Sequence, residues 1–494
     1  MCAAMADRRS GILLHPTSLP GDEVQGVLDS NARRFIDFLK AAKQSVWQVL
    51  PMGPTHSDRS PYQCLSAHAG NPLLISWQSL LEAGLLLKEN LIPLGSSFEE
   101  NLRACVYMSQ ASLKHCRNSK KDDILEQFQN FVVKHRWLRD YALYQLIRAK
   151  ENFKPWYQWQ PALRDRSLRA LEEIIDSHEE EIEAQCFQQF LFFKQWLEIK
   201  DYANENGILM FGDLPIFVAH DSADVWANRR CFQLDESGLC SVIAGVPPDY
   251  FSETGQRWGN PLYDWSYLAE TSYEWWVQRI KTQLEMFDLF RIDHFRGFEA
   301  YWEIPATEDT AINGRWVKGP GAAFFQALES HFGVLPLVAE DLGVITHEVI
   351  QLRDQFNFPG MRIMQFAFDG DPNNSYLPHH HIENCVVYTG THDNNTLRGW
   401  LRALDESVLN TIREVLKVEN VDLASAIIKA AMESVANLVI LPMQDVLDLA
   451  EDARMNTPGT TENNWHWRFQ WTELNTEQTE NLAALSVSSS RYNQ

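Results

Sequence analysis

Four acidic residues stand where short apolar segments of the chain end. They are Asp213, Asp293, Glu340 and Asp393. Cleavage of a glycosidic bond with retention needs two carboxyl groups about 5 Å apart, one ionised as the nucleophile and one protonated as the acid. The four carboxyl groups therefore indicate chemistry at a sugar acetal centre, provided that the fold brings them together.

Asp293 and Glu340 differ in their neighbours along the chain. Arg291 lies two residues before Asp293, on the same face of a strand. Its guanidinium favours the ionised carboxylate and lowers its pKa. Glu340 follows Leu-Val-Ala with no cation beside it, and desolvation would raise its pKa. We therefore expect Asp293 to be the nucleophile and Glu340 the general acid, with Asp393 stabilising a cationic transition state or holding sugar hydroxyls.

Each of these carboxylates has an alternative role. A carboxylate at a strand end can simply cap the next helix, and Asp341 is the better capping candidate of the pair that it forms with Glu340. Capping by the whole set is disfavoured, because the carboxylates recur at the ends of several strand-like segments.

Aromatic residues gather in the segment 245–261, where Pro and Gly prevent a long helix. Tyr250, Phe251 and Trp258 would offer ring faces to the apolar C–H patches of sugars. The alternative is that these rings pack beneath the loop. Near the C-terminus, Asn464 could donate a hydrogen bond to a sugar hydroxyl, while the tryptophans beside it could be structural.

The elements that would position these residues follow a regular order. Eight short apolar segments, of the kind that form buried parallel strands, alternate with segments of helical periodicity such as 32–43 and 322–332. Eight such repeats predict an α/β fold, the (β/α)8 TIM barrel, in which catalytic residues come from the carboxyl ends of the strands. The segments are 11–15, 46–50, 208–213, 288–293, 337–340, 362–368, 385–389 and 438–442.

Two insertions interrupt the expected barrel, which we take to occupy residues 1–494 as one catalytic domain. Residues 66–206, after the second strand, predict an inserted helical subdomain. Residues 223–273, after the third strand, are rich in Gly, Pro and Trp and predict a loop-rich insertion. The helices expected in the first insertion include 124–134, 137–150, 168–183 and 186–206.

Composition excludes several classes of function. The formal net charge of −23 argues against nucleic acid as a partner. Eight cysteines occur without a C-x-x-C motif, so zinc and redox motifs are unsupported, and reduced thiols are expected. We read His379-His380-His381 as a solvated loop and expect neither a cofactor nor a catalytic metal. The sequence shows no signal peptide or membrane-spanning run, so we expect no membrane partner and a cytoplasmic location.

Twelve segments, taken in order along nearly the whole chain, resemble the 4-α-glucanotransferases, also called amylomaltases or disproportionating enzymes, of the α-amylase superfamily. Among them, GVPPDYFS and NWHWR are specific to this branch, whereas RIDH and THDN are shared more widely. The segments are 10–21, 47–55, 60–63, 69–75, 212–226, 244–252, 259–265, 290–298, 339–343, 359–368, 388–396 and 464–468.

The resemblance implies Asp293 as nucleophile, Glu340 as acid and base, and Asp393 as transition-state stabiliser. It implies that the 244–261 loop is a lid over the donor and acceptor sugars. The substrates would be maltooligosaccharides and starch- or glycogen-derived glucans, handled by double displacement. Further substrate contacts are implied for Tyr62, Asp213, Arg291, His294 and His392.

Two rival functions remain open, and two segments depart from the family pattern. An α-amylase-type hydrolase would use the same carboxylates, and a non-catalytic glucan-binding protein would keep the aromatic clefts. Residues 26–29 replace the usual Gly-Ile-Gly-Asp turn but keep Asp29 as a helix cap. Residues 56–59 replace Gly-Tyr-Gly-Asp, so the Tyr of an accessory glucan contact is missing.

Overall fold

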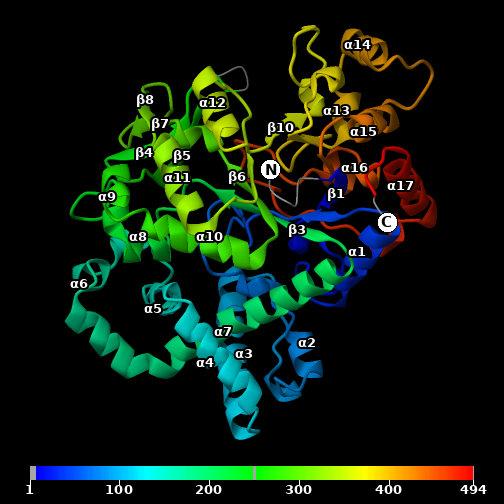
Figure 1. Cartoon of the computed structure of the whole chain (residues 1–494). Helices are drawn as coiled ribbons and strands as arrows, with labels where there is room; N and C mark the ends of the chain where they lie inside the picture. The colour runs from blue at the N-terminus through cyan, green and yellow to red at the C-terminus, as the bar shows by residue number, and fades with distance from the viewer. Residues whose placement is uncertain (1–6, 249–251, 493–494) are drawn as a thin grey trace.

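Eight parallel strands form the centre of the computed structural model, which describes residues 7–248 and 252–492. The amide of Ala339 donates to the carbonyl of Pro359 at 2.8 Å and joins the two edge strands. The sheet is thereby nearly closed as the predicted (β/α)8 barrel (Figure 1). In sheet order the strands are β10 (Gly360–Ile363), β11 (Cys385–Tyr388), β12 (Leu438–Pro442), β1 (Arg9–Leu13), β2 (Val46–Gln48), β3 (Leu209–Pro215), β6 (Leu289–Asp293) and β9 (Leu337–Ala339).

All eight expected strands are present, with two displaced. The first begins at residue 9 rather than 11, and the sixth covers 360–363 rather than 362–368. The sixth ends early because the chain turns into a 3₁₀ helix, η8 (Met364–Phe366), although the apolar run continues. An apolar run thus locates a strand better than it fixes the strand's ends.

Side chains of the strands alternate between the barrel interior and the helical layer outside, as the period of two requires. The outward set includes Met210, Ile292 and Ala339, which belong to the larger core shared with the helices. Asp213, Arg291, Asp293 and Glu340 continue the inward parity, so the strands aim all four toward the barrel axis. The inward set includes Val46, Phe211, Leu289, Val338, Val386 and Ile440, which pack together.

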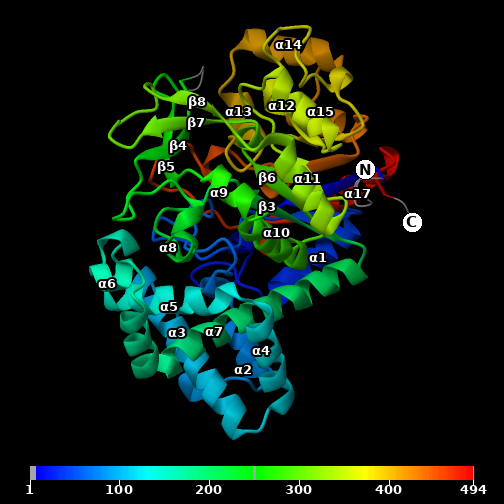
Figure 2. The ribbon, with the colours of Figure 1, turned by 60° about the vertical axis from the view of Figure 1, so that its left-hand side comes forward.

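Helices surround this barrel (Figures 1 and 2). As predicted, one follows β1 and another precedes β9, and the side chain of Asp29 caps the first by accepting from the amide of Asn31. No helix in the described part of the chain is long and apolar enough to cross a membrane. The helices are α1 (Ser30–Ala41), α10 (Glu274–Met286), α11 (Gly321–Phe332), α12 (His347–Gln355), α13 (Leu397–Arg402), α14 (Glu406–Leu416), α15 (Leu423–Glu433), α16 (Met443–Val446) and α17 (Thr476–Ser488).

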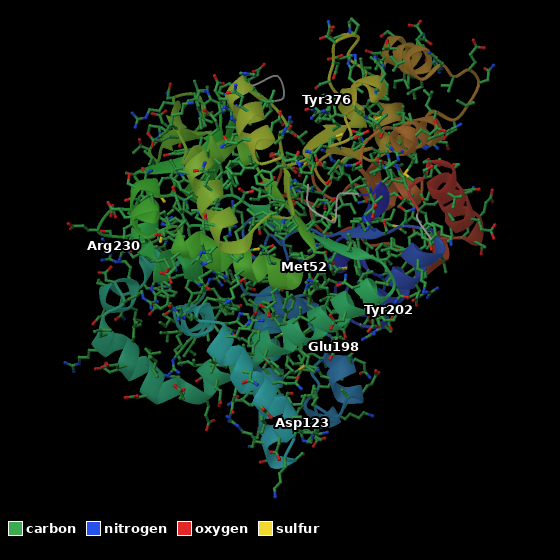
Figure 3. The ribbon with its side chains drawn as sticks, viewed as in Figure 1. Met52, Asp123, Glu198, Tyr202, Arg230 and Tyr376 are labelled. Carbon is green, nitrogen blue, oxygen red and sulfur yellow. The ribbon has the colours of Figure 1, made fainter. Side chains whose placement is uncertain are left out.

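The long stretch between β2 and β3 is helical and lies beneath the barrel in Figures 1 and 2. Asp123, at the start of α4 (Asp122–Lys134), marks the part turned away from the strands (Figure 3). The predicted break near residue 184 is wrong, because one helix runs through it and its only non-helical backbone is at His178. The division into a separate subdomain stays a prediction. These helices are α2 (Trp77–Glu82), α3 (Phe98–Asn118), α4 (Asp122–Lys134), α5 (Trp137–Lys150), α6 (Pro161–Arg164) and α7 (Leu168–Glu205).

The expectation of loops after β3 misses two strands and two short helices, α8 (Ala223–Ala227) and α9 (Trp265–Glu270). The two strands pair with each other, and β4 also pairs with the first strand of a hairpin that follows β6, a partner far away in sequence that gives no local signal. This second sheet has the antiparallel order β5 (Gln256–Pro261), β4 (Val242–Val246), β7 (Ala300–Pro305) and β8 (Arg315–Lys318).

Candidate active site

The register of three neighbouring strands sets the geometry of the site. Asp213 on β3 stands opposite Arg291 on β6, and Ile292 on β6 stands opposite Ala339 on β9. Asp293 directly follows Ile292, and Glu340 directly follows Ala339, so Asp293 and Glu340 lie side by side. Adjacent strands are about 4.8 Å apart. That spacing suits the separation of about 5 Å between the two carboxyl groups of a retaining glycosidase.

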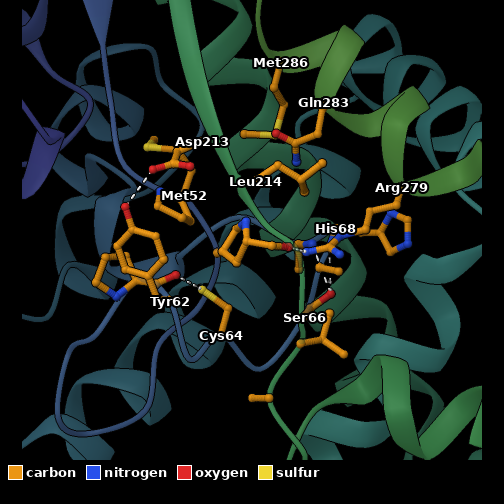
Figure 4. A pocket seen from close by; sticks show the side chains of 18 of the residues that line it. Met52, Tyr62, Cys64, Ser66, His68, Asp213, Leu214, Arg279, Gln283 and Met286 are labelled. Atoms are coloured by element: carbon orange, nitrogen blue, oxygen red, sulfur yellow. Dashed lines mark hydrogen bonds between the residues drawn. The ribbon is translucent and has the colours of Figure 1, made fainter. Parts of the chain in front are cut away.

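Arg291 links two carboxylates at the centre of the site. Its Nη1 donates to Asp213 Oδ2 at 2.5 Å, and its Nη2 pairs with Asp293 Oδ1. The hydroxyl of Tyr62 donates to the same oxygen of Asp213 at 2.6 Å, along the dashed line in Figure 4. Arg291 is only 6% exposed, so these pairs replace the water that the guanidinium loses on folding.

Glu340 is held by backbone amides rather than by a cation. His294 N donates to its Oε2 at 2.6 Å and Leu342 N to its Oε1 at 2.8 Å. His294 adopts a left-handed conformation with φ 53°, in which a residue other than glycine is unusual, and this turn ends the strand beside Glu340. Burial and the nearby Asp293 carboxylate raise the pKa of Glu340 to about 7, against these amides and the more distant Arg291.

The expected net lowering of the Asp293 pKa is wrong. Burial raises this pKa above its ordinary value, although Arg291 lowers it as the sequence indicated. Asp293 keeps a paired guanidinium, whereas Glu340 has only amide donors. A proton shared by the two carboxyl groups therefore resides on Glu340, because the ion pair favours the ionised form of Asp293.

Asp393 reaches the same cluster from the loop after β11. Asn456 Nδ2 donates to its Oδ1 at 2.6 Å, and Arg454 Nη2 donates to its backbone carbonyl at 2.5 Å. His392 Nε2 lies 3.3 Å from the same carboxylate oxygen. The His392 ring stacks on Tyr62, with centroids 4.9 Å apart and planes at 15°. The structure thus brings Tyr62, His392 and Asp393 to one side of the site.

Of the three aromatic residues in the predicted lid, Trp258 is the one that the structure describes. Its ring meets His294 edge-on, with centroids 4.9 Å apart and an interplanar angle of 85°. Since His294 directly follows Asp293, Trp258 lies beside the reacting centre. Tyr250 and Phe251 lie outside the described residues, and their substrate contacts stay predictions.

The side chain of Asn464 forms hydrogen bonds within its own loop. Its Oδ1 accepts from Thr457 N at 2.9 Å, and its Nδ2 donates to the carbonyl of Thr460 at 3.0 Å. This carboxamide therefore braces residues 457–464, and its contact with a sugar hydroxyl stays a prediction.

Three residues near the site were missed or were given another role. Arg454 and Asn456 hold Asp393, and the ring of Trp465 lies 6.0 Å from Tyr62 and 5.9 Å from His392. The segment that contains them has no periodic pattern. Their only signal in the sequence is that they follow the eighth strand, whose loop must face the same end of the barrel.

A small cavity of about 50 Å³ lies beside this cluster (Figure 4). Tyr62 and Asp213 line one side, and Gln283 and Met286 of α10 line the other. Asp213 Oδ1 has no hydrogen-bond partner among the described residues, and the cavity gives ordered water room to supply one. Within the ranges 7–248 and 252–492, no group of three or more His, Cys, Asp or Glu residues is arranged to hold a metal ion.

Comparison with known proteins gives a consistent result. A family model described as 4-alpha-glucanotransferase matches residues 14–475. A 4-alpha-glucanotransferase of Synechocystis sp. is 49% identical over 483 residues, covering 95% of this chain and 96% of the relative. One of Thermus thermophilus is 46% identical, with 98% and 99% covered. The structure of an amylomaltase from Streptococcus agalactiae in complex with acarbose has a TM-score of 0.93 and 35% identity, with 98% and 100% covered.

The raised pKa of Glu340 can be measured without substrate. We expect the infrared carbonyl band of its protonated carboxyl group to vanish as the pH rises through about 7. The difference between the wild type and Glu340→Gln isolates this band. In Asp293→Asn the midpoint should move to lower pH, because the negative neighbour that favours the protonated form is gone.

A midpoint near the ordinary glutamate value of about 4.3 would contradict this account of Glu340. Asp445→Asn serves as the control, since Asp445 is another buried carboxyl group whose pKa burial raises, to about 6. Removing it should leave the band assigned to Glu340 in place.

Proposed function

The chain belongs to the 4-alpha-glucanotransferase family, and we propose that Asp293 is its nucleophile, Glu340 its acid and base, and Asp393 its transition-state stabiliser. The enzyme transfers α-1,4-glucan segments from a donor to the 4-hydroxyl of an acceptor glucan or glucose. The observation that carries the assignment is the side-by-side pair at the ends of β6 and β9, in which only Asp293 has a guanidinium partner.

In the first half-reaction, the protonated carboxyl group of Glu340 gives its proton to the glycosidic oxygen. A carboxylate oxygen of Asp293 attacks the anomeric carbon, the carbon–oxygen bond to the leaving glucan breaks, and a glycosyl ester forms on Asp293. Arg291 keeps the nucleophile ionised and oriented before the attack. The negative charge of Asp393 stabilises the positive charge that develops on the sugar ring.

In the second half-reaction, Glu340 is ionised and takes the proton of an acceptor 4-hydroxyl. The acceptor oxygen attacks the anomeric carbon from the face that the first glucan left, and the Asp293 carboxylate departs. Two inversions give net retention. Glu340 ends protonated, as it began, so one cycle restores the pair.

Transfer rather than hydrolysis requires that water be kept from the glycosyl ester. Water competes at about 55 M, so an acceptor must be held in an oriented position from which water is excluded. Trp258 lies against His294 beside the nucleophile, where its ring can cover the ester and support an acceptor sugar. An α-amylase-type hydrolase would use the same carboxylates without such cover. A non-catalytic binding protein would not need the pair of carboxyl groups.

We take maltooligosaccharides and starch- or glycogen-derived glucans as the substrates, because two carboxyl groups at glycosidic spacing suit an acetal donor. The net charge of −23 disfavours nucleic acid as a partner. The described cysteines are free thiols, in keeping with a reducing compartment such as the cytoplasm.

Asp293→Asn should abolish transfer while the protein stays folded, because an amide of the same shape cannot attack as an anion. We expect kcat with maltotriose to fall at least about 10⁴-fold, the scale seen when a nucleophile is removed. The product ladder by chromatography measures transfer, and circular dichroism with a melting curve measures folding.

Asp288→Asn is the matched control for this variant, since Asp288 precedes the same strand at its opposite end and accepts from Met210 N at 2.7 Å. It should lower the melting temperature yet keep turnover. Near-wild-type turnover in Asp293→Asn, with an unchanged melting curve, would rule out Asp293 as the nucleophile.

Trp258→Ala should raise the ratio of hydrolysis to transfer, because the ester loses its cover and the acceptor loses a ring face. Disproportionation of maltotriose conserves reducing ends, whereas hydrolysis increases their number. Free glucose, total reducing ends and melting temperature measured together separate the two reactions from instability.

Trp316→Ala removes an indole from β8 of the same sheet, where the ring contacts Trp302 and Arg296, and should leave the ratio near wild type. If Trp258→Ala lowers the melting temperature but keeps the wild-type ratio, Trp258 is a hydrophobic anchor and the acceptor is held elsewhere.

A further inference from the structure

The loop 389–397, which we define as running from the end of β11 to the first residue of α13, carries His392 and Asp393 into the site. One turn within it is self-supporting, since Asn394 Oδ1 accepts from the amide of Thr391 at 2.8 Å and from its hydroxyl at 2.9 Å. This local turn sets the shape of the loop centre. It does not fix the loop relative to the barrel, so other contacts must do so.

One buried carboxylate contacts both ends of this loop. Asp445 Oδ2 accepts from the hydroxyl of Thr389 at 2.5 Å, and its Oδ1 accepts from the amide of Leu397 at 2.7 Å. Thr389 directly follows β11, and Leu397 is the first residue of α13. Asp445 lies on α16, directly after the neighbouring barrel strand β12.

These two hydrogen bonds are buried, so losing either would be costly. Asp445 is 5% exposed and Thr389 is fully buried, so water cannot replace a lost bond. Burial raises the pKa of Asp445 to about 6, and above that pH both carboxylate oxygens act as charged acceptors. The same C-terminal part of the chain supplies Asn456 and Arg454, which hold Asp393 directly.

We propose that Asp445 is a positioning residue, which fixes Asp393 in the site by clamping both ends of the loop 389–397. This inference rests on the proposed role of Asp393 as transition-state stabiliser. Asp445 itself touches no reacting atom in this account. Its effect passes through Thr389 and Leu397 into the loop.

The test removes one arm of the clamp and asks whether the loss depends on Asp393. Thr389→Val removes the donor hydroxyl and keeps the side-chain shape, whereas Thr389→Ser keeps the donor. With α-maltosyl fluoride as donor, we expect kcat/KM to fall about tenfold in Thr389→Val and less than about twofold in Thr389→Ser, because a small misplacement of a catalytic group is costly.

A double-mutant cycle separates positioning from a general loss of structure. In the Asp393→Asn background, Thr389→Val should cost less than about twofold, because the group that the clamp positions is gone. The control is Thr282→Val, which removes another buried hydroxyl. Thr282 lies on α10, and its hydroxyl is 2.9 Å from Nδ1 of His68. This control variant should cost less than about twofold in kcat/KM in both backgrounds, even where it lowers the melting temperature.

Two outcomes would overturn the positioning role alone. They are an equal loss from Thr389→Val in both backgrounds, and no loss in either. If Asp393→Asn by itself keeps near-wild-type kcat/KM, the proposed role of Asp393 fails, and the positioning role fails with it. The single variant Asp393→Asn thus distinguishes the two failures.

Discussion

The site depends on the two ion pairs of the Arg291 guanidinium. Arg291, on β6, joins Asp213 on β3 to Asp293 on β6, and its side chain is almost fully buried. Removing one partner of a buried ion pair typically costs 3–5 kcal/mol, because the other charge is left unpaired. The network therefore constrains two barrel strands as well as the nucleophile. It also decides which carboxyl group carries the proton, since Glu340 lies outside it.

The barrel supplies the geometry that this charge network requires. Parallel register places Asp213 beside Arg291, and Asp293 beside Glu340 one residue further along. The inward parity that packs the apolar barrel interior also aims these four side chains at the axis. The loops after β11 and β12 complete the site, and Asp445 joins the loop after β11 to the end of β12.

The sequence predicts the parts of this arrangement that have a local signal. Strand-like runs locate all eight strands, and the carboxylates stand at their ends, so the barrel and its catalytic candidates could be inferred. The antiparallel partners β4 and β7 are far apart in the chain, and Asn456 reaches Asp393 across 63 residues, so neither leaves a local pattern. The pKa of Asp293 could not be inferred either, because burial, which outweighs Arg291, is a tertiary property.

Trapping the glycosyl ester tests most directly the claim that Asp293 is the nucleophile beside a protonated Glu340. The Glu340→Gln variant is incubated with 5-fluoro-α-glucosyl fluoride, whose good leaving group needs no acid and whose ring fluorine slows turnover of the ester. Peptide mass spectrometry then locates the label. The account predicts one added glycosyl group, on the peptide that contains Asp293. A label on Asp213 or Asp393, with Asp293 unmodified, would contradict it.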